Sequence, residues 1–503
     1  MNEPKQQTPI DVIPHPFPLN DASAADFDGP LFASVIEPDD NDFASIAQLQ
    51  ARLAEGPLTS VKLVKRCLAR IAALNRRGPQ LRAVIETNPD ALHIAECLDT
   101  ERARGVIRGP LHGIPVLLKD SIDTGDNLQT SAGSLALVGQ PSPADAYLVQ
   151  RLRAVGAIIL GKANMSEWMG FRDWQAPYGW SSRGGQTQSA LGKGWPVFGS
   201  SAGSAVAVCA GLAPVAVGTE TNGSLMGPAY MNQVVGLRPT QGLISTSGLV
   251  PLSSRQDTPG PMARTVTDAA LLLDAMFGLD RPEPAPAGAP DSLIDYASGL
   301  DAQALKGARL GYPSVTAQGG AMIEDPAFAL LARRLESAGA KLVPVDFVFP
   351  PLMQTQLAVL RFDFKRELAH YLAGRPGIGP KTLADVIAFN AANPSPEGHG
   401  QGLLESAQAL MFNEPFYSLL ADSLRNQSRA LIDTALQAHD LEALVDLPMG
   451  NLMGYGAQAG YPGLMVPAGR DDEGMLAGLY LAGGQWRDRA LLALGYAFEQ
   501  SGA

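Results

Sequence analysis

Two turns that contain serine are places where a side-chain hydroxyl could act as a nucleophile. The first, Gly199–Gly203 (GSSAG), fits the pattern G-x-S-x-G with Ser201 at its centre. The second, Gly218–Ser224 (GTETNGS), follows an apolar run, and its Gly223 would let the backbone approach a ligand closely. Successive amides of such a turn can face one concavity and stabilise an oxyanion. Ser224 is therefore a candidate nucleophile for acyl transfer.

The first turn has two other interpretations, which the sequence leaves open. In an α/β-hydrolase esterase, Ser201 would be the nucleophile and Trp195–Phe198 the strand before it. The base would then be one of three downstream histidines, His370, His399 or His439. Alternatively, the serines only cap the free amides at the start of a helix that begins at Ala202.

Several other chemistries are not supported. The segment Gly156–Ala163 (GAIILGKA) nearly fits a phosphate-binding loop, but it ends in alanine and its four intervening residues are apolar, as in a buried strand. The histidines lack the spacing of a zinc peptidase. Three cysteines, Cys67, Cys97 and Cys209, have neither metal nor redox spacing. We therefore expect no metal site, no disulfide framework and a reducing compartment.

Composition narrows the class of protein. The 503 residues are 46% hydrophobic and 17% charged, which suits a packed core, and 53 glycines with 39 prolines indicate many turns. The net charge of −12 argues against a nucleic-acid partner. The most apolar stretch, Ala205–Val217, is interrupted by Gly211 and Pro214 and is too weak to span a bilayer. The prediction is a cytoplasmic protein with no membrane or nucleic-acid partner.

Alternating helical and extended patterns predict an α/β fold. Val116–Leu118 is expected to form a short buried strand that ends at Lys119. Residues 1–40 are expected to form an N-terminal arm, 41–503 a single domain, 281–290 a Pro/Ala linker, and 353–440 a mainly helical insertion or cap. Helices are expected near 45–55, 59–74, 90–104, 266–276, 326–338 and 488–500, and strands near 157–160, 309–312, 341–345, 443–447 and 463–467.

Four motifs in order make the chain resemble the amidase signature family. They are Gly113–Asp120 (GIPVLLKD), Gly199–Ser204 (GSSAGS), Gly218–Ser224 and Val235–Thr240 (VGLRPT). The segment Trp180–Thr187 (WSSRGGQT) is similar to peptide amidases within that family. The resemblance implies a large mixed β-sheet wrapped by helices, with the motif core at 80–275. It also implies an amidase acting on carbon–nitrogen bonds other than peptide bonds, without cofactor or metal, as a monomer or homodimer.

The resemblance also assigns roles to particular residues. Lys119 would be the base, Ser200 the bridging serine on a cis peptide, and Ser224 the nucleophile that forms an acyl-enzyme. Ser201 and Thr219 would orient these three groups. The oxyanion would be held by the backbone amides of Thr221, Asn222, Gly223 and Ser224.

The residue chemistry agrees with these roles. A covalent intermediate divides amide hydrolysis into two easier steps. Lys119 is useful as a base only when it is neutral, and burial without a salt-bridge partner would lower its pKa. Lowering that pKa by ~3 units corresponds to about 4 kcal/mol that the fold must supply.

Aromatic residues give a separate prediction about the substrate. Four of the five tryptophans lie between residues 168 and 195, just before Ser200. With Met226 and Tyr230 after the second serine turn, Trp168 and Trp174 would line an apolar pocket; alternatively these side chains only cover the sheet. We expect a small-molecule amide, either an apolar or aryl amide, an anilide or an arylurea, with peptide C-terminal amides second. The subunit of an amidotransferase and a binding protein without activity are further alternatives.

Overall fold

The computed structural model describes residues 39–280, 288–290, 295–316, 319–377, 379–411, 413–471 and 474–502. Within them, eleven strands form one mixed sheet in the order β1-β3-β2-β6-β8-β7-β12-β13-β11-β9-β10, and β4 (Trp180–Ser181) pairs with β5 (Gly185–Gln186). The strands of the large sheet are β1 (Val84–Thr87), β2 (Pro115–Lys119), β3 (Ile158–Ala163), β6 (Val215–Glu220), β7 (Val235–Arg238), β8 (Thr258–Ala263), β9 (Arg309–Pro313), β10 (Lys341–Val345), β11 (Ala443–Asp446), β12 (Gly463–Arg470) and β13 (Leu476–Ala482). The predicted fold class, a large mixed sheet wrapped by helices, is confirmed.

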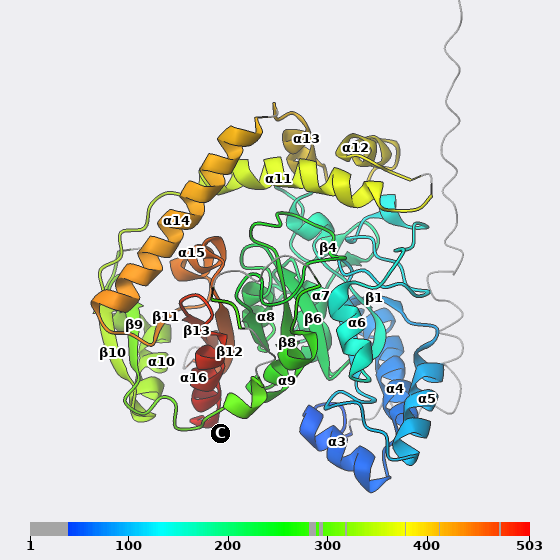
Figure 1. Cartoon of the computed structure of the whole chain (residues 1–503), viewed down its shortest axis with the longest axis horizontal. Helices are drawn as coiled ribbons and strands as arrows, with labels where there is room; N and C mark the ends of the chain where they lie inside the picture. The colour runs from blue at the N-terminus through cyan, green and yellow to red at the C-terminus, as the bar shows by residue number, and fades with distance from the viewer. Residues whose placement is uncertain are drawn as a thin grey trace, which may run out of the picture.

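Helices cover the sheet on both faces (Figure 1). They are α3 (Ile46–Glu55), α4 (Ser60–Arg70), α5 (Ala91–Ala103), α6 (Tyr147–Ala154), α7 (Ala202–Cys209), α8 (Met226–Met231), α9 (Val266–Met276), α10 (Pro326–Ser337), α11 (Met353–Ala373), α12 (Leu383–Ala392), α13 (Gly402–Gln408), α14 (Glu414–Ala438), α15 (Asn451–Ala459) and α16 (Asp488–Gln500). The side chains of Ser45, Thr59 and Thr265 accept backbone hydrogen bonds at the starts of α3, α4 and α9. The expected starts therefore match, because an N-cap oxygen satisfies an otherwise free amide. The predicted arm at 1–40 lies outside the described residues except for 39 and 40, and the linker at 281–290 except for 288–290.

The strand directions bring the candidate residues to one edge of the sheet. β2 and β6 are parallel neighbours, with Leu118 opposite Val217. β8 runs antiparallel to β6, with Glu220 opposite Thr258. The carboxyl ends of β2 and β6 therefore meet the start of β8, and the loops that follow Lys119 and Glu220 emerge side by side.

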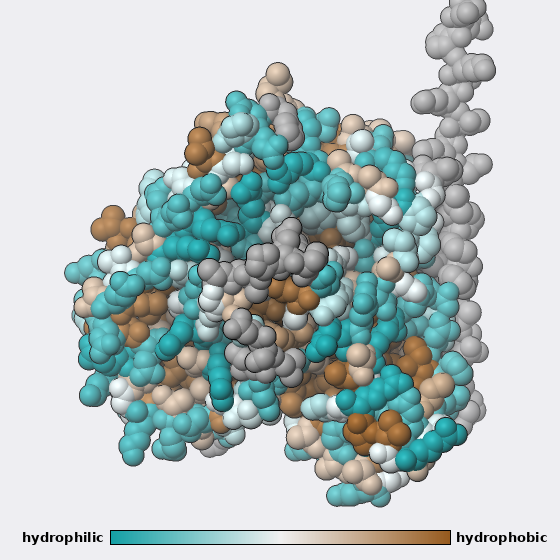
Figure 2. All heavy atoms as spheres, viewed as in Figure 1, coloured by the Kyte–Doolittle hydropathy of each residue, from teal (hydrophilic) through white to brown (hydrophobic). Residues whose placement is uncertain are grey.

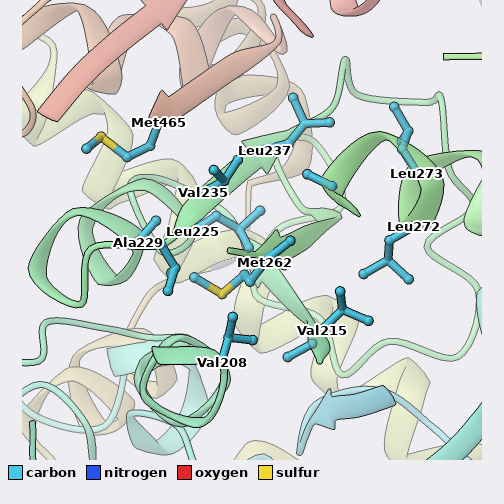
Figure 3. Close-up of a cluster of buried hydrophobic side chains, with 14 of the residues drawn as sticks. Val208, Val215, Leu225, Ala229, Val235, Leu237, Met262, Leu272, Leu273 and Met465 are labelled. Atoms are coloured by element: carbon cyan, nitrogen blue, oxygen red, sulfur yellow. The ribbon is translucent and has the colours of Figure 1, made fainter. Parts of the chain in front are cut away.

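A continuous apolar core fixes the loop that follows β6. Figure 3 shows Leu225, the residue after Ser224, among the core side chains of Val235 and Met262. Gly218 on β6 lies opposite Gly260 on β8, and a Cβ atom at either position would approach a Leu225 methyl carbon to 2.6 or 2.7 Å. The paired glycines thus make the space that the Leu225 side chain occupies, and this packing anchors the loop beneath Ser224.

The predicted helical segment near 353–440 is confirmed as α11–α14, which arch over one edge of the molecule (Figure 1). Polar contacts from α11 and the turn after it join this arch to the sheet loops. Asp363 accepts from the Ser253 hydroxyl at 2.7 Å, and Glu367 accepts from the Ser254 amide at 2.7 Å. Arg375 donates to Asp123 at 2.8 Å. The visible face is mostly hydrophilic, with hydrophobic residues in separate patches (Figure 2). Among the described residues, no helix combines the length and apolar character needed to cross a membrane.

Candidate active site

Lys119 ends β2 and is completely buried. Its Nζ donates to the hydroxyls of Ser200 at 2.7 Å, Ser201 at 3.0 Å and Thr219 at 2.9 Å, and to the Thr219 carbonyl at 3.0 Å. No carboxylate of the described chain lies within 4.0 Å of this amine. The structure therefore surrounds the lysine with neutral oxygen atoms rather than with a counter-charge.

Burial is the main influence on the Lys119 amine. Loss of hydration disfavours the charged form and lowers its pKa from 10.5 to about 7, while the charges of Asp257 and Glu220 act in the opposite direction. A substantial fraction of the amine is then neutral near pH 7, so that its nitrogen can accept a proton.

Ser200 and Ser201 lie on the segment that leads into α7. The Gly199–Ser200 peptide bond is cis, and the Ser200 carbonyl accepts from the Ser166 amide at 3.0 Å. Ser201 precedes α7, but its side chain does not cap the helix. Its hydroxyl instead donates to the Thr219 carbonyl at 3.0 Å and accepts from the Thr219 amide at 3.2 Å. The capping interpretation of these serines is therefore wrong for Ser201.

Ser224 lies at the end of the loop after β6. Its carbonyl accepts from the Ser201 amide at 3.2 Å, which joins the two serine turns. Ser224 is 8% exposed, whereas Lys119 and Ser200 are fully buried. Of these three residues, only Ser224 therefore retains some exposed surface.

The backbone of the Ser224 loop is shaped for close approach. Gly223 has φ of +75°, and a Cβ atom there would lie 3.0 Å from the terminal methyl of Met453 on α15. Within the described chain, the amides of Asn222, Gly223 and Ser224 have no hydrogen-bond acceptor. Free amides in succession are suited to bind an oxyanion.

Two buried acidic side chains hold this loop through hydrogen bonds, and the sequence motifs predicted a role for neither of them. Glu220 accepts from the Leu225 and Met226 amides at 2.7 and 3.1 Å. Asp257 accepts from the Thr221 hydroxyl at 2.5 Å, and burial raises the pKa of Asp257 to about 7. Glu220 lies within the second serine turn and could have been noticed there. Asp257 is distant in sequence, and no local pattern marks it.

The predicted pocket residues do not converge on one cavity. Met226 is buried in the main core, and Tyr230 donates from its hydroxyl to the Leu476 carbonyl at 2.8 Å. Trp168 is fully buried beside Phe364 of α11. Trp174 is 61% exposed and lines a cavity of about 240 Å³ with Tyr178. For Met226 and Trp168, burial favours the interpretation that they cover the core.

The cavity at Trp174 adjoins the Ser200 segment. Ser166 lines the cavity, and its amide contacts the Ser200 carbonyl. Tyr178 packs on Phe198, with ring centroids 4.5 Å apart. Leu357 and Leu360 of α11 form part of the wall, so the helical arch contributes to this cavity. The aromatic and aliphatic part of its wall suits an apolar group, and Glu167, Arg172 and Asp173 also line it.

The α/β-hydrolase interpretation does not match the local structure. Trp195–Phe198, the strand it requires, contains no strand residue. The partners of the Ser201 hydroxyl are Lys119 and Thr219, while His399 packs against the Trp180 ring at 4.5 Å. In the part of the chain that the structure describes, no three His, Cys, Asp or Glu side chains form a group that could hold a metal ion.

Comparisons with known proteins agree with this geometry. A family model described as Amidase matches residues 62–492. A relative from Arabidopsis thaliana named "Probable amidase" is 38% identical over 466 residues, which are 91% of this chain and 90% of the relative. The solved peptide amidase from Stenotrophomonas maltophilia is 44% identical, with a TM-score of 0.85 over 91% of this chain and 97% of that one. A glutamyl-tRNA(Gln) amidotransferase subunit from Halorhodospira halophila is 32% identical over 91% of this chain and 96% of its own length.

Proposed function

The chain belongs to the amidase family, and from that premise we propose that it hydrolyses a carboxamide through an acyl-enzyme on Ser224, with Ser200 and Lys119 as the proton relay. The observation that carries this proposal is the buried Lys119 amine, which has no carboxylate within 4.0 Å in the described chain and lies 2.7 Å from the Ser200 hydroxyl. A buried amine with a lowered pKa beside a serine hydroxyl is the arrangement expected of a general base.

The contact between Lys119 and Ser200 supports the first half of the proton path, and the step between Ser200 and Ser224 is part of the proposal. Neutral Lys119 accepts the Ser200 proton while the Ser200 oxygen accepts the proton of Ser224. The Ser224 oxygen attacks the amide carbon, and the free amides of the loop stabilise the oxyanion. The proton returns from Lys119 through Ser200 to the leaving nitrogen, and the carbon–nitrogen bond breaks. Water then cleaves the acyl ester by the same relay and releases the acid.

The substrate that we propose is a small amide with an apolar or aryl group, either an aryl amide, an anilide or an arylurea. The cavity beside Ser166, with the Trp174 and Tyr178 rings at its wall, supports this class. A peptide C-terminal amide is the second candidate, and the similarity to the Stenotrophomonas maltophilia peptide amidase favours it. In that case the cavity would receive an aromatic side chain of the peptide.

The test is an activity panel on purified protein. Benzamide, acetanilide, phenylurea and N-acetylphenylalaninamide would each be compared with an aliphatic analogue. We expect Ser224→Ala to lower turnover by at least ~10³-fold, because the nucleophile is lost. Ser337→Ala, an exposed position on α10, is the matched control and should retain full activity. Undiminished turnover in Ser224→Ala would refute the proposed nucleophile.

A second variant tests the substrate class. Trp174→Ala should reduce kcat/KM for aryl amides more than for aliphatic amides, because it removes one aromatic wall of the cavity. An equal effect on both classes would contradict the aryl pocket. Hydrolysis of glutamine only in the presence of partner chains would instead support an amidotransferase subunit.

A further inference from the structure

A separate polar cavity of about 320 Å³ lies where the loop between β7 and β8 faces α14. Arg255 and Gln256 of the loop, Arg425 and Arg429 of α14, and Gln458 of α15 contribute to its lining. Asp257, which accepts from Thr221 of the Ser224 loop, also lines this cavity. The other lining residues take no part in the proposed proton transfer between Lys119, Ser200 and Ser224.

The arginines of this cavity are incompletely compensated. Arg425 donates to the Gln241 side-chain oxygen at 2.6 Å and to the Arg255 carbonyl, and Arg429 donates to the Ala459 carbonyl at 2.9 Å. Neither guanidinium has a carboxylate within 4.0 Å in the described chain. Only Arg255 has one, Asp363, at 3.5 Å.

The acidic groups near the cavity do not cancel this charge. Asp257 is engaged by the Thr221 hydroxyl and by the Leu252 and Ser253 amides. Asp422 is on the wall but exposed to solvent, and Asp280 accepts from the Ser245 hydroxyl at 2.7 Å. Burial and the charges of Arg429 and Arg255 lower the pKa of Arg425. The like charges of these arginines repel one another across the cavity, and an anion bound between them would relieve the repulsion.

A second observation points into the same cavity. Gln256 is 3% exposed, and neither its side-chain nitrogen nor its side-chain oxygen has a partner among the described residues. Leaving a buried amide unpaired costs about 1–3 kcal/mol, so such groups are normally satisfied. The amide atoms are covered by protein in this structure, so the side chain has to turn toward the cavity before its nitrogen can donate to the oxygen atoms of a ligand that the guanidiniums bind.

From these contacts we infer that the cavity binds a small organic carboxylate. Guanidinium groups bind planar carboxylates through paired hydrogen bonds, and the buried amide supplies a further donor. The volume is at the lower end of the range for small-molecule sites, which limits the ligand to a few carbon atoms. The carboxylate could be a free metabolite or part of an amide substrate, and in the second case the inference rests on the proposed function.

The test is calorimetric titration of the Ser224→Ala variant with succinate, so that binding is measured without turnover. Its neutral analogue 1,4-butanediol is the ligand control. We expect succinate to bind, butanediol not to bind, and Arg425→Met to weaken succinate binding at least ~10-fold, since it removes a charged hydrogen bond. Arg333→Met, an exposed arginine on α10, is the matched control and should bind as before.

Gln256→Leu is a second test that leaves the arginines in place, and it should weaken succinate binding several-fold. Failure of succinate to bind, or undiminished binding in both Arg425→Met and Gln256→Leu, would overturn the inference whether or not the protein hydrolyses amides. Steady-state kinetics separate the two sources of carboxylate. If the carboxylate is part of the substrate, Arg425→Met should raise KM for succinamate and leave KM for benzamide unchanged. If the carboxylate is a separate ligand, benzamide should not displace bound succinate.

Discussion

Lys119 differs from an ordinary lysine because its amine is fully buried among hydroxyl and carbonyl oxygens. Burial lowers its pKa to about 7, and Asp257 and Glu220 keep it from falling further. The same side chain therefore sets both a catalytic pH dependence and a stability that varies with pH.

The first prediction concerns pH and activity. If neutral Lys119 is the base, kcat/KM should rise about tenfold per pH unit below the pKa of the free enzyme and level off above about pH 7. The measurement is kcat/KM for one amide from pH 5 to 9. A rate that is flat over pH 5–7 would contradict the role of Lys119 as base.

The second prediction concerns pH and stability. The pKa of Lys119 is about 7 in the folded protein against 10.5 for an unperturbed lysine, so the unfolded chain binds more protons between these values. The wild type should therefore gain unfolding free energy relative to Lys119→Met as the pH rises from 7 to 10, by on the order of 4 kcal/mol in total. Urea denaturation at several pH values measures the difference, and parallel curves for the two proteins would refute the shift.

Asp257 is a residue that positions the Ser224 loop through Thr221. Its charge favours protonated Lys119, and it accepts the Thr221 hydroxyl at 2.5 Å. Asp257→Asn should move the acid limb of kcat/KM to lower pH and reduce kcat by roughly 10-fold, because a charged hydrogen bond is weakened. The pKa values of Lys119 and Asp257 are both about 7. The acid limb of the wild-type kcat/KM profile therefore reports the titration of the two groups together. Glu442→Gln, an exposed charge removal, should leave the profile unchanged. An unshifted limb in Asp257→Asn would exclude this role.

At the scale of elements, the strands position the serines through their register. Gly218 and Gly260 face each other on β6 and β8, and Leu225 fills the space between them. Strand β2 could be predicted from its apolar residues, and so could the positions at which α3, α4 and α9 begin. The strand at Trp195–Phe198 that the esterase alternative requires is absent, because this segment is irregular backbone between β5 and α7. Strands β7, β8 and β13 carry glycine or proline and lack a clear alternating pattern.

Gly218→Ala tests this packing. The added methyl would lie 2.6 Å from a Leu225 methyl carbon and 2.8 Å from the Ser201 hydroxyl. We expect a loss of about 1–3 kcal/mol of unfolding free energy, together with a fall in kcat as both serine turns shift. At Gly320, the nearest atom of the described residues to an added methyl is 3.7 Å away, so Gly320→Ala should match wild type. Normal turnover in Gly218→Ala would show that the loop tolerates displacement.

At the scale of the whole molecule, the helical arch is joined to the sheet by polar contacts, of which those of Asp363 and Arg375 are buried. Asp363, Glu367, Tyr371 and Arg375 recur at every fourth residue along α11 and the turn after it, and they contact the loops that contain Asp123 and Ser253. Asp123 lies four residues after Lys119 in the sequence. The arch therefore contacts the loop that follows Lys119 and also lines the cavity at Trp174.

Arg375→Met tests the coupling. It leaves the Asp123 carboxylate buried without its cation, which should lower the unfolding free energy by about 3 kcal/mol. Adding Asp123→Asn should recover part of this loss, because contacting residues are not additive. Arg108→Met, which breaks an exposed pair with Glu101, should change stability by at most about 1 kcal/mol. Equal effects of Arg375→Met and Arg108→Met in urea denaturation would exclude a structural role for the buried pair.

The sequence by itself determined the local features of this protein. The glycine turns, the apolar strand that ends at Lys119, the helix starts and the helical stretch at 353–440 depend on neighbouring residues, and together with the family resemblance they predicted the two serines and the lysine. Only the tertiary structure decided which distant groups meet. The contact between Asp257 and Thr221, the burial of Trp168 and Met226, and the arginine cavity come from residues far apart in sequence, whose proximity depends on strand order and packing. Burial then sets the charge state of Lys119, because hydration is lost only when the whole chain closes around it.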